Sequence, residues 1–219
     1  MSFHWRYVEW TSALPWGNGV AVLTVILLPF LLGCGGVEEE ISPEEFQIVS
    51  SLARPAAAEL MRTLVGELTA AMEEGGPENA VAFCSSEAIP LTEAVEGRVQ
   101  GGLELKRTSS RYRNPENAPD QAEEEALRHF ERVVEGGTPP PSSYVQRVSA
   151  EEYRYYQPLM VGEFCLQCHG APETMSPQVR GVLEEEYPGD LATGYEAGDF
   201  RGLVRVSVPA SLVADREGS

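Results

Sequence analysis

Basic side chains are scarce in this 219-residue chain: 16 Lys and Arg stand against 34 Asp and Glu, a formal net charge of −18. Because affinity for nucleic-acid phosphates comes mainly from clustered Lys and Arg, this composition argues against a nucleic-acid-binding protein. No internal repeat, kinase, cyclase or DNA-binding segment is evident. With 42% hydrophobic residues, the composition is that of a globular protein, and the length allows one domain or two small ones.

Long hydrophobic runs are also missing, apart from residues 20–32, which are apolar and uncharged. This run is shorter than the roughly 20 residues of a comfortable transmembrane helix. It ends in Leu31-Leu32-Gly33-Cys34, which resembles the lipobox of bacterial lipoprotein signals. In such signals the chain is cut before the cysteine, and the cysteine thiol receives a diacylglycerol. The alternatives are a buried core segment with an incidental cysteine or an uncleaved N-terminal anchor.

These features predict a signal peptide at residues 1–33 and an acidic tether at residues 34–42. We expect an exported lipoprotein on the periplasmic face of a membrane, anchored through lipid on Cys34. The region before the apolar run departs from the usual signal, because Arg6 is its only fixed positive charge and Glu9 opposes it. Outside the cytosol, thiols tend to be oxidised or ligated.

Cysteines are few, at positions 34, 84, 165 and 168, and two of them fall in the segment Cys165-Leu166-Gln167-Cys168-His169. This C-x-x-C-H spacing is the attachment motif of c-type haem. The two thiols add to haem vinyl groups, and the adjacent histidine becomes the proximal iron ligand. Zinc would need a second ligand pair, and a thioredoxin-like dithiol would need a βαβ context, and the sequence offers neither. We therefore expect one covalent haem c, held through Cys165 and Cys168, with His169 on the iron.

The ligand on the other haem face is less constrained by the sequence. The candidates are Met61, Met72, Met160, Met175, His129, Cys84 and solvent. The methionines either lie too near His169 in sequence to reach the opposite face or follow a helical pattern typical of core methionine. Cys84 lies on the apolar face of a predicted helix, where a thiol facing ferric iron would ionise and bind. A buried free cysteine acting as a small hydrophobic residue fits the sequence equally well.

Residue periodicity predicts an α+β domain over residues 43–212. Ser42-Pro43-Glu44-Glu45 begins a long N-terminal helix that Pro55 is expected to kink, and Gly75-Gly76-Pro77 separates it from the helix carrying Cys84. A second turn or short helix is expected after Pro90. Further helices are predicted at 119–135 and 178–187, and strands at 103–107, 144–148, 153–161 and 202–208.

Three segments add a family resemblance. They are Arg107-Thr108-Ser109-Ser110-Arg111-Tyr112-Arg113-Asn114-Pro115-Glu116-Asn117-Ala118-Pro119, Cys165-Leu166-Gln167-Cys168-His169-Gly170 and Gly194-Tyr195-Glu196-Ala197-Gly198-Asp199-Phe200-Arg201-Gly202. With Phe83-Cys84, and in this order, they resemble a bacterial family of exported single-haem domains, first described structurally in a cyanobacterial c-type cytochrome. The resemblance covers roughly residues 45–210. It implies a PAS-like antiparallel sheet flanked by helices.

The resemblance also implies a haem ligated by cysteine and histidine on opposite faces. Carried onto this sequence, His169 is the proximal ligand, Cys165 and Cys168 are the thioether anchors, and Cys84 is the distal ligand. Arg107, Arg111 and Arg113 are candidates to pair with haem propionates, because a guanidinium pairs well with a carboxylate. The alternative is that all three are surface arginines.

Two functions follow from such a haem. In a redox or gas sensor, a thiolate ligand lowers the potential, and after reduction a small gas such as CO or NO would displace Cys84 and release its helix. The alternative is a membrane-tethered periplasmic electron carrier, which its negative charge would steer to a redox or signalling partner with a basic surface. A peroxidase-like enzyme would need an open iron site and a distal acid–base group, so we do not expect an enzyme.

Overall fold

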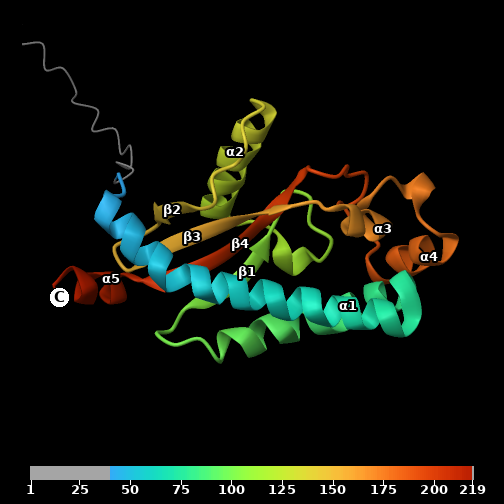
Figure 1. The fold of residues 1–219 in the computed structure, drawn as a ribbon, viewed down its shortest axis with the longest axis horizontal. Coiled ribbons are helices and arrows are strands. Elements are labelled where there is room, and N and C mark those ends of the chain that lie inside the picture. Colours follow the sequence, from blue (N-terminus) through green and yellow to red (C-terminus); the bar gives the residue numbers. More distant parts are fainter. Residues whose placement is uncertain (1–39, 219) are drawn as a thin grey trace, which may run out of the picture. The chain divides into compact units, whose positions relative to one another are not determined.

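Residues 40–218 are described by the computed structural model of the chain (Figure 1). The predicted signal peptide, Cys34 and most of the predicted tether lie outside these residues. The helices are α1 (Pro43–Glu96), α2 (Gln121–Glu135), α3 (Leu166–His169), α4 (Pro177–Glu186) and α5 (Ala210–Glu217). The strands are β1 (Glu104–Thr108), β2 (Tyr144–Arg147), β3 (Glu152–Met160) and β4 (Phe200–Pro209). The long N-terminal helix and the antiparallel sheet packed with helices confirm the predicted α+β class.

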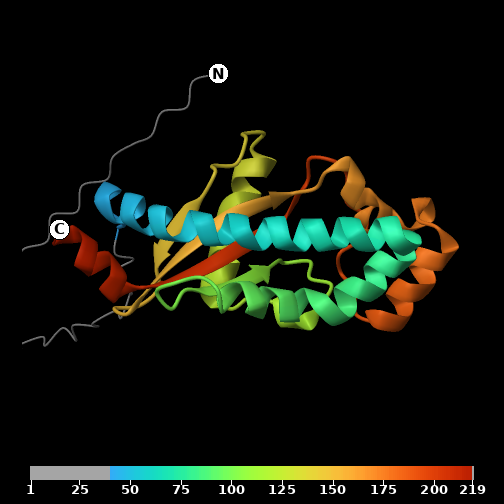
Figure 2. The ribbon, with the colours of Figure 1, turned by 60° about the horizontal axis from the view of Figure 1, so that its bottom comes forward.

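Helix α1 begins at a capping box and then folds back on itself. The Ser42 hydroxyl accepts a hydrogen bond from the Glu45 N–H at 3.1 Å, and the Glu45 carboxylate accepts one from the Ser42 N–H at 2.8 Å. The chain reverses at Gly75 and Gly76, whose backbone angles are not helical. Gly76 has a φ of +75°, a left-handed conformation that glycine adopts at little cost. Residues 43–74 form the outgoing limb and residues 77–96 the returning limb, which run side by side in opposite directions (Figures 1 and 2).

The predicted break between the two limbs is therefore confirmed, but the prolines within them do not interrupt the helix. Backbone angles stay helical at Pro55, where a kink was predicted, and at Pro90, where a new turn or short helix was predicted. Both prolines lie at the solvent side of α1, and their residues are exposed. Proline removes one backbone donor and crowds the carbonyl four residues before it, a local cost that packing along a long helix can offset.

The sheet has the strand order β1-β4-β3-β2, and every neighbouring pair is antiparallel. Strand β4 lies in the interior of the sheet, with Val204 opposite Arg107 of β1 and Val206 opposite Tyr155 of β3. Because side chains alternate along a strand, one face of β4 carries Val204, Val206 and Val208, and the other carries Leu203, Arg205 and Ser207. The sheet thus presents two chemically different faces to the helices that cover it.

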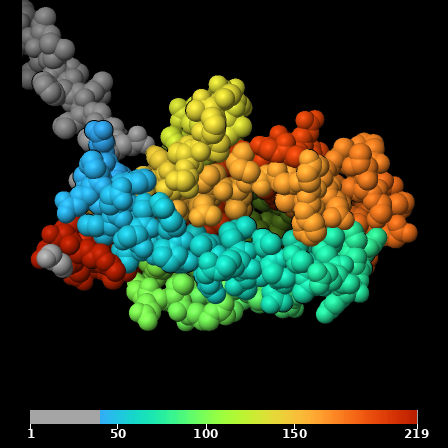
Figure 3. Space-filling view, in the orientation of Figure 1, coloured from blue at the N-terminus to red at the C-terminus, as the bar shows by residue number. Residues whose placement is uncertain are grey.

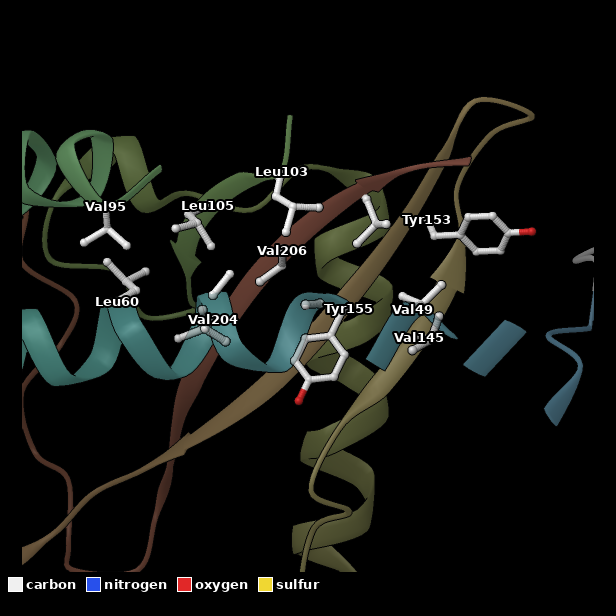
Figure 4. Packing of buried hydrophobic residues seen from close by; sticks show 14 of the residues in the cluster. Val49, Leu60, Val95, Leu103, Leu105, Val145, Tyr153, Tyr155, Val204 and Val206 are labelled. Atoms are coloured by element: carbon white, nitrogen blue, oxygen red, sulfur yellow. The ribbon is translucent and has the colours of Figure 1, made fainter. Parts of the chain in front are cut away.

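Helix α1 covers the apolar face of the sheet. Small residues of the outgoing limb, Ala53, Ala56 and Ala57, are almost fully buried and let the helix approach the strands closely. Figure 4 shows Leu60 and Val95, one from each limb, directed toward each other beside Val204 of the sheet. This core is the largest in the described chain and fixes the position of α1 on the sheet.

Helix α2 covers the opposite, polar face. Its Ala126, Leu127 and Phe130 pack against two sheet residues, Tyr156 and Leu203. Beside this small apolar cluster the helix also buries a carboxylate.

The carboxylate belongs to Glu123, which is fully buried. Its Oε2 lies 2.7 Å from the Lys106 Nζ, and the Thr108 hydroxyl donates to the same oxygen at 3.3 Å. The Nε of Arg205 lies 3.4 Å from the other carboxylate oxygen. These partners compensate the cost of burying the charge and tie α2 to the two strands β1 and β4.

Helix α5 was not predicted, and the expected domain end at residue 212 falls within it. Val213 of α5 is 1% exposed and belongs to the main core. No helix within residues 40–218 combines the length and the apolar character needed to cross a membrane.

The core packing predicts that alanine substitution destabilises the protein far more at one position of the outgoing limb than at another. Leu60 is 0% exposed and Val65 is 49% exposed. Leu60→Ala should lower the free energy of unfolding by about 2–5 kcal/mol, because it leaves a cavity between α1 and the sheet. Val65→Ala should change it by less than about 0.5 kcal/mol. Urea denaturation followed by circular dichroism checks both, and equal losses would contradict this description of the core.

Candidate functional site

The segment Cys165–His169 folds as one short helical stretch directly after β3. A 3-10 turn at Glu163–Cys165 runs into α3, so the thiols of Cys165 and Cys168 are three residues apart on one side of the turn. Neither is in a disulfide bond, and neither is Cys84. This turn presents two thiols and an adjacent imidazole from a single rigid element.

Gly170 ends the turn through a close backbone approach. A side-chain Cβ at this position would lie 2.6 Å from the carbonyl oxygen of Leu166. The Gly170 N–H donates to that same oxygen at 2.9 Å. The motif therefore requires the absence of a side chain immediately after His169.

The His169 imidazole is fixed by a backbone carbonyl from far along the chain. Its Nδ1 lies 2.7 Å from the carbonyl oxygen of Ala192, which can only accept, so Nδ1 carries the proton. Burial lowers the pKa of His169 to about 3, and the positive charges of Arg113 and Arg201 act in the same direction. His169 is thus a neutral imidazole whose Nε2 lone pair is free to bind a metal.

Residues 192–195 hold the turn from one side. The N–H groups of Tyr195 and Gly194 donate to the carbonyls of His169 at 2.9 Å and Gly170 at 2.7 Å. The Tyr195 ring stands edge-on to the imidazole, with ring centroids 6.3 Å apart. Sequence reasoning did not identify Ala192 as a site residue, because it acts through a backbone carbonyl and carries no side-chain signal.

Cys84 lies on the returning limb of α1, half-buried. Burial raises the pKa of the Cys84 thiol, while the charges of Arg107 and Arg113 lower it. Burial raises the pKa of the Cys168 thiol as well, and the charge of Cys84 raises it further by a smaller amount. Val81, three residues before Cys84, belongs to the cluster against which Cys168 packs. The fold therefore brings Cys84 close to the C-x-x-C-H turn, although the two are far apart in sequence.

Apolar side chains surround these groups in two clusters. One cluster joins the returning limb to α4 and contains Val81, Met175, Val179, Leu183 and Tyr187, with Cys168 packed against it. The other contains Val161, Ala192 and Tyr195, with Cys165 and Leu166 packed against it. In the space-filling view a hollow lies between the teal part of α1 and the orange segment after β3, with green atoms of the chain after α1 at its floor (Figure 3).

Arg107 has an unusual environment. It follows Leu105 on the α1 side of the sheet, and its Nε is buried without a hydrogen-bond partner among the described residues. Its charge reaches both Cys84 and His169. A buried donor without an acceptor is costly, so this guanidinium is suited to an anionic group that the protein itself does not supply.

Arg111 is arranged differently. Its Nε donates to the carbonyl of Leu191 at 3.1 Å, its Nη2 donates to the carbonyl of Thr193, and its guanidinium lies 4.0 Å from the centre of the Tyr195 ring. Arg111 thus holds the loop that supports His169.

The other candidate ligands lie in other surroundings. His129 stacks on Tyr144 with ring centroids 4.4 Å apart, on α2, which lies apart from α3 in both ribbon views (Figures 1 and 2). Met61 packs against the main core, and Met160 is 40% exposed. Met175 is buried in the cluster beside Cys168. Within residues 40–218 no group of three or more His, Cys, Asp or Glu is arranged to hold a metal ion.

Comparisons with known proteins agree with this picture of the fold. A family model described as Tll0287-like: Tll0287 matches residues 38–209, which is well over half of the chain. The solved structure of the cyanobacterial heme-protein Tll0287 is 26% identical in sequence, with a TM-score of 0.53. That match covers 77% of this chain and 96% of the other. No curated protein sequence matches the chain.

The close approach at Gly170 predicts that Gly170→Ala lowers the free energy of unfolding by about 1–3 kcal/mol, because the Cβ overlaps the Leu166 carbonyl. Gly181, within α4, is the matched control, since a Cβ there would meet no atom within 4 Å. Gly181→Ala should stabilise by up to about 1 kcal/mol through helix propensity. Urea denaturation of both variants checks the pair, and an unchanged Gly170→Ala protein would show that the turn yields easily.

Proposed function

The chain belongs to the Tll0287-like family, and on that premise we propose that it binds one haem c covalently through Cys165 and Cys168. His169 and Cys84 would then be the two axial ligands, on opposite faces. The observation that carries the proposal is that the limb bearing Cys84 packs, through Val81, in the cluster that Cys168 joins, near Arg107 with its buried Nε. The heme named for the related structure supports the same cofactor here.

The residues around the site fit a haem. The two apolar clusters suit the faces of a flat, largely apolar ring, and Cys165 and Cys168 belong to the borders of these clusters. The buried Nε of Arg107, which has no partner among the described residues, suits a propionate carboxylate. Arg111 would act on the site through the loop at residues 191–195. When bound, the haem supplies an iron that exchanges one electron and binds small ligands.

We favour a role in redox or gas sensing, because of where Cys84 is placed. The returning limb that carries it packs on α4 through Val81, and it connects directly to β1 of the sheet. An axial bond from Cys84 would hold this limb against α3 and α4. When Cys84 leaves the iron, the limb would lose that restraint and change the surface it shows to a partner.

An electron carrier is the second candidate, favoured by the net charge of −18 and by the exposed Phe164 next to Cys165. Export, and a lipid anchor at Cys34 on the periplasmic side of a membrane, would serve either role. The negative charge would steer the protein to a redox or signalling partner with a basic surface, at a rate that falls with salt. We do not propose an enzyme.

The ligand proposal predicts the spectra of two variants. The ferric protein should show a low-spin signal in electron paramagnetic resonance with the narrow spread of g values of a thiolate ligand, and Cys84→Ala should abolish it. Ser86→Ala, two residues along the same limb and exposed, should leave the signal unchanged. A thiolate signal that survives in Cys84→Ala would remove Cys84 from the iron.

Covalent attachment is tested separately. Haem should resist extraction by acidic acetone in the parent protein and in Cys84→Ala, but should be fully extracted from a variant in which Cys165 and Cys168 are both alanine. Haem that is extracted from the parent protein would contradict attachment through these thiols.

The sensing role predicts that ferrous Cys84→Ala binds CO at least about tenfold more tightly than the parent, because no ligand must first be displaced; tenfold corresponds to about 1.4 kcal/mol. Titration with CO followed by absorption measures both affinities. Equal affinities would count against displacement of Cys84 and would favour the electron carrier.

A further inference from the structure

The peptide group that holds His169 is itself held by a buried ion pair. The Ala192 carbonyl accepts from His169 Nδ1 at 2.7 Å, and the Ala192 N–H donates to the Asp190 carboxylate at 2.7 Å. The other Asp190 oxygen accepts from the Arg113 Nε at 2.9 Å. Arg113 and Asp190 are only 11% and 10% exposed, so this pair is shielded from solvent.

Arg113 also contacts the C-x-x-C-H turn directly. Its Nη2 donates to the carbonyl of Cys168 at 2.5 Å and to the carbonyl of Ala192 at 3.3 Å. Ala192 O therefore accepts from both the imidazole and the guanidinium. Every member of this ring of contacts, from His169 through Ala192, Asp190 and Arg113 to Cys168, is joined to the next by a hydrogen bond or by the chain.

We propose that Arg113 and Asp190 are positioning residues that set the electron-donating strength of His169 and the charge at the iron, a proposal that rests on the haem ligation proposed above. Arg113 draws electron density from the Ala192 carbonyl and so weakens its hydrogen bond with His169 Nδ1. Asp190 neutralises Arg113 and fixes the orientation of the Ala192 peptide. Arg113 and Asp190 thus have opposite effects on the electron-donating strength of His169.

Electrostatics supports this balance from both sides of the site. The charge of Arg113 lowers the pKa of His169 and also that of the Cys84 and Cys168 thiols, so it reaches both proposed axial ligands. At low solvent exposure such charges are only weakly screened. Loss of either member of the pair should therefore change the reduction equilibrium, and the two losses should act in opposite directions.

The direction in which each substitution shifts the reduction equilibrium follows from the charge that remains beside the iron. Asp190→Asn leaves the positive Arg113 uncompensated, which favours the ferrous state, since it carries one positive charge fewer than the ferric state. Arg113→Gln leaves the negative Asp190, which favours the ferric state. We expect the equilibrium constant for reduction to rise about tenfold in the first variant and to fall about tenfold in the second, which is 59 mV each way for a one-electron couple.

The experiment is a spectroelectrochemical titration of the haem-loaded protein, with resonance Raman spectra of the iron–histidine vibration in the ferrous state, recorded for each variant in a Cys84→Ala background so that the iron is five-coordinate. Glu124→Gln and Arg128→Gln are the matched controls, because they make the same charge changes in an exposed pair on α2, at 52% and 55% side-chain exposure. These controls should shift neither measurement. Arg113→Lys, which keeps the charge but loses the planar fork, should stay near the parent potential while the Raman band moves.

Opposite shifts in Asp190→Asn and Arg113→Gln support the proposal. Shifts of the same sign, or none, would overturn it, because a merely structural role loosens the ligand in the same way in both variants. If either variant fails to fold, the Arg113→Lys spectrum decides: a Raman band that moves at an unchanged potential supports the proposal, and any other result overturns it. A parent protein without a histidine-ligated haem would instead refute the proposed function.

Discussion

The reversal of α1 at Gly75 and Gly76 is the constraint on which the candidate site depends. A straight helix would carry Cys84 away from the rest of the described chain, whereas the left-handed backbone of Gly76 returns it toward α3. Packing of the outgoing limb on the valine face of the sheet then sets where the returning limb can lie. The position of the Cys84 thiol therefore depends mainly on how the outgoing limb packs on the sheet, and less on contacts of the thiol itself.

Positive charge is distributed unevenly in this acidic protein. Of its 16 basic side chains, Arg107, Arg113 and Arg201 all act on His169, while the excess of carboxylates elsewhere is largely exposed. Such an arrangement keeps the His169 imidazole neutral and would offer a favourable place for anionic groups of a bound cofactor.

Much of this fold could be predicted from the sequence, since its main elements have clear periodicity and caps. The capping box at Ser42, the double-glycine break and the alternating strand now seen as β4 all lie where local chemistry places them. Pro55 was misleading, because local propensity does not show that a helix is held by packing along its length. The Ala192 carbonyl and Asp190, the partner of Arg113, could not have been found, since their roles arise from contacts between distant segments.

The meeting of Cys84 with the C-x-x-C-H turn also has a consequence for chain entropy. A haem bound to both would join residue 84 to residues 165–169 and close a loop of about 80 residues, a cross-link that restricts the unfolded chain by about 4–5 kcal/mol in the chain-entropy model. One end of that cross-link would be permanent and the other, at Cys84, a reversible coordinate bond. Such a cross-link would restrain the chain as a disulfide does, but it would open without reduction of any sulfur. The folding stability of the domain would then depend on the oxidation state of the iron.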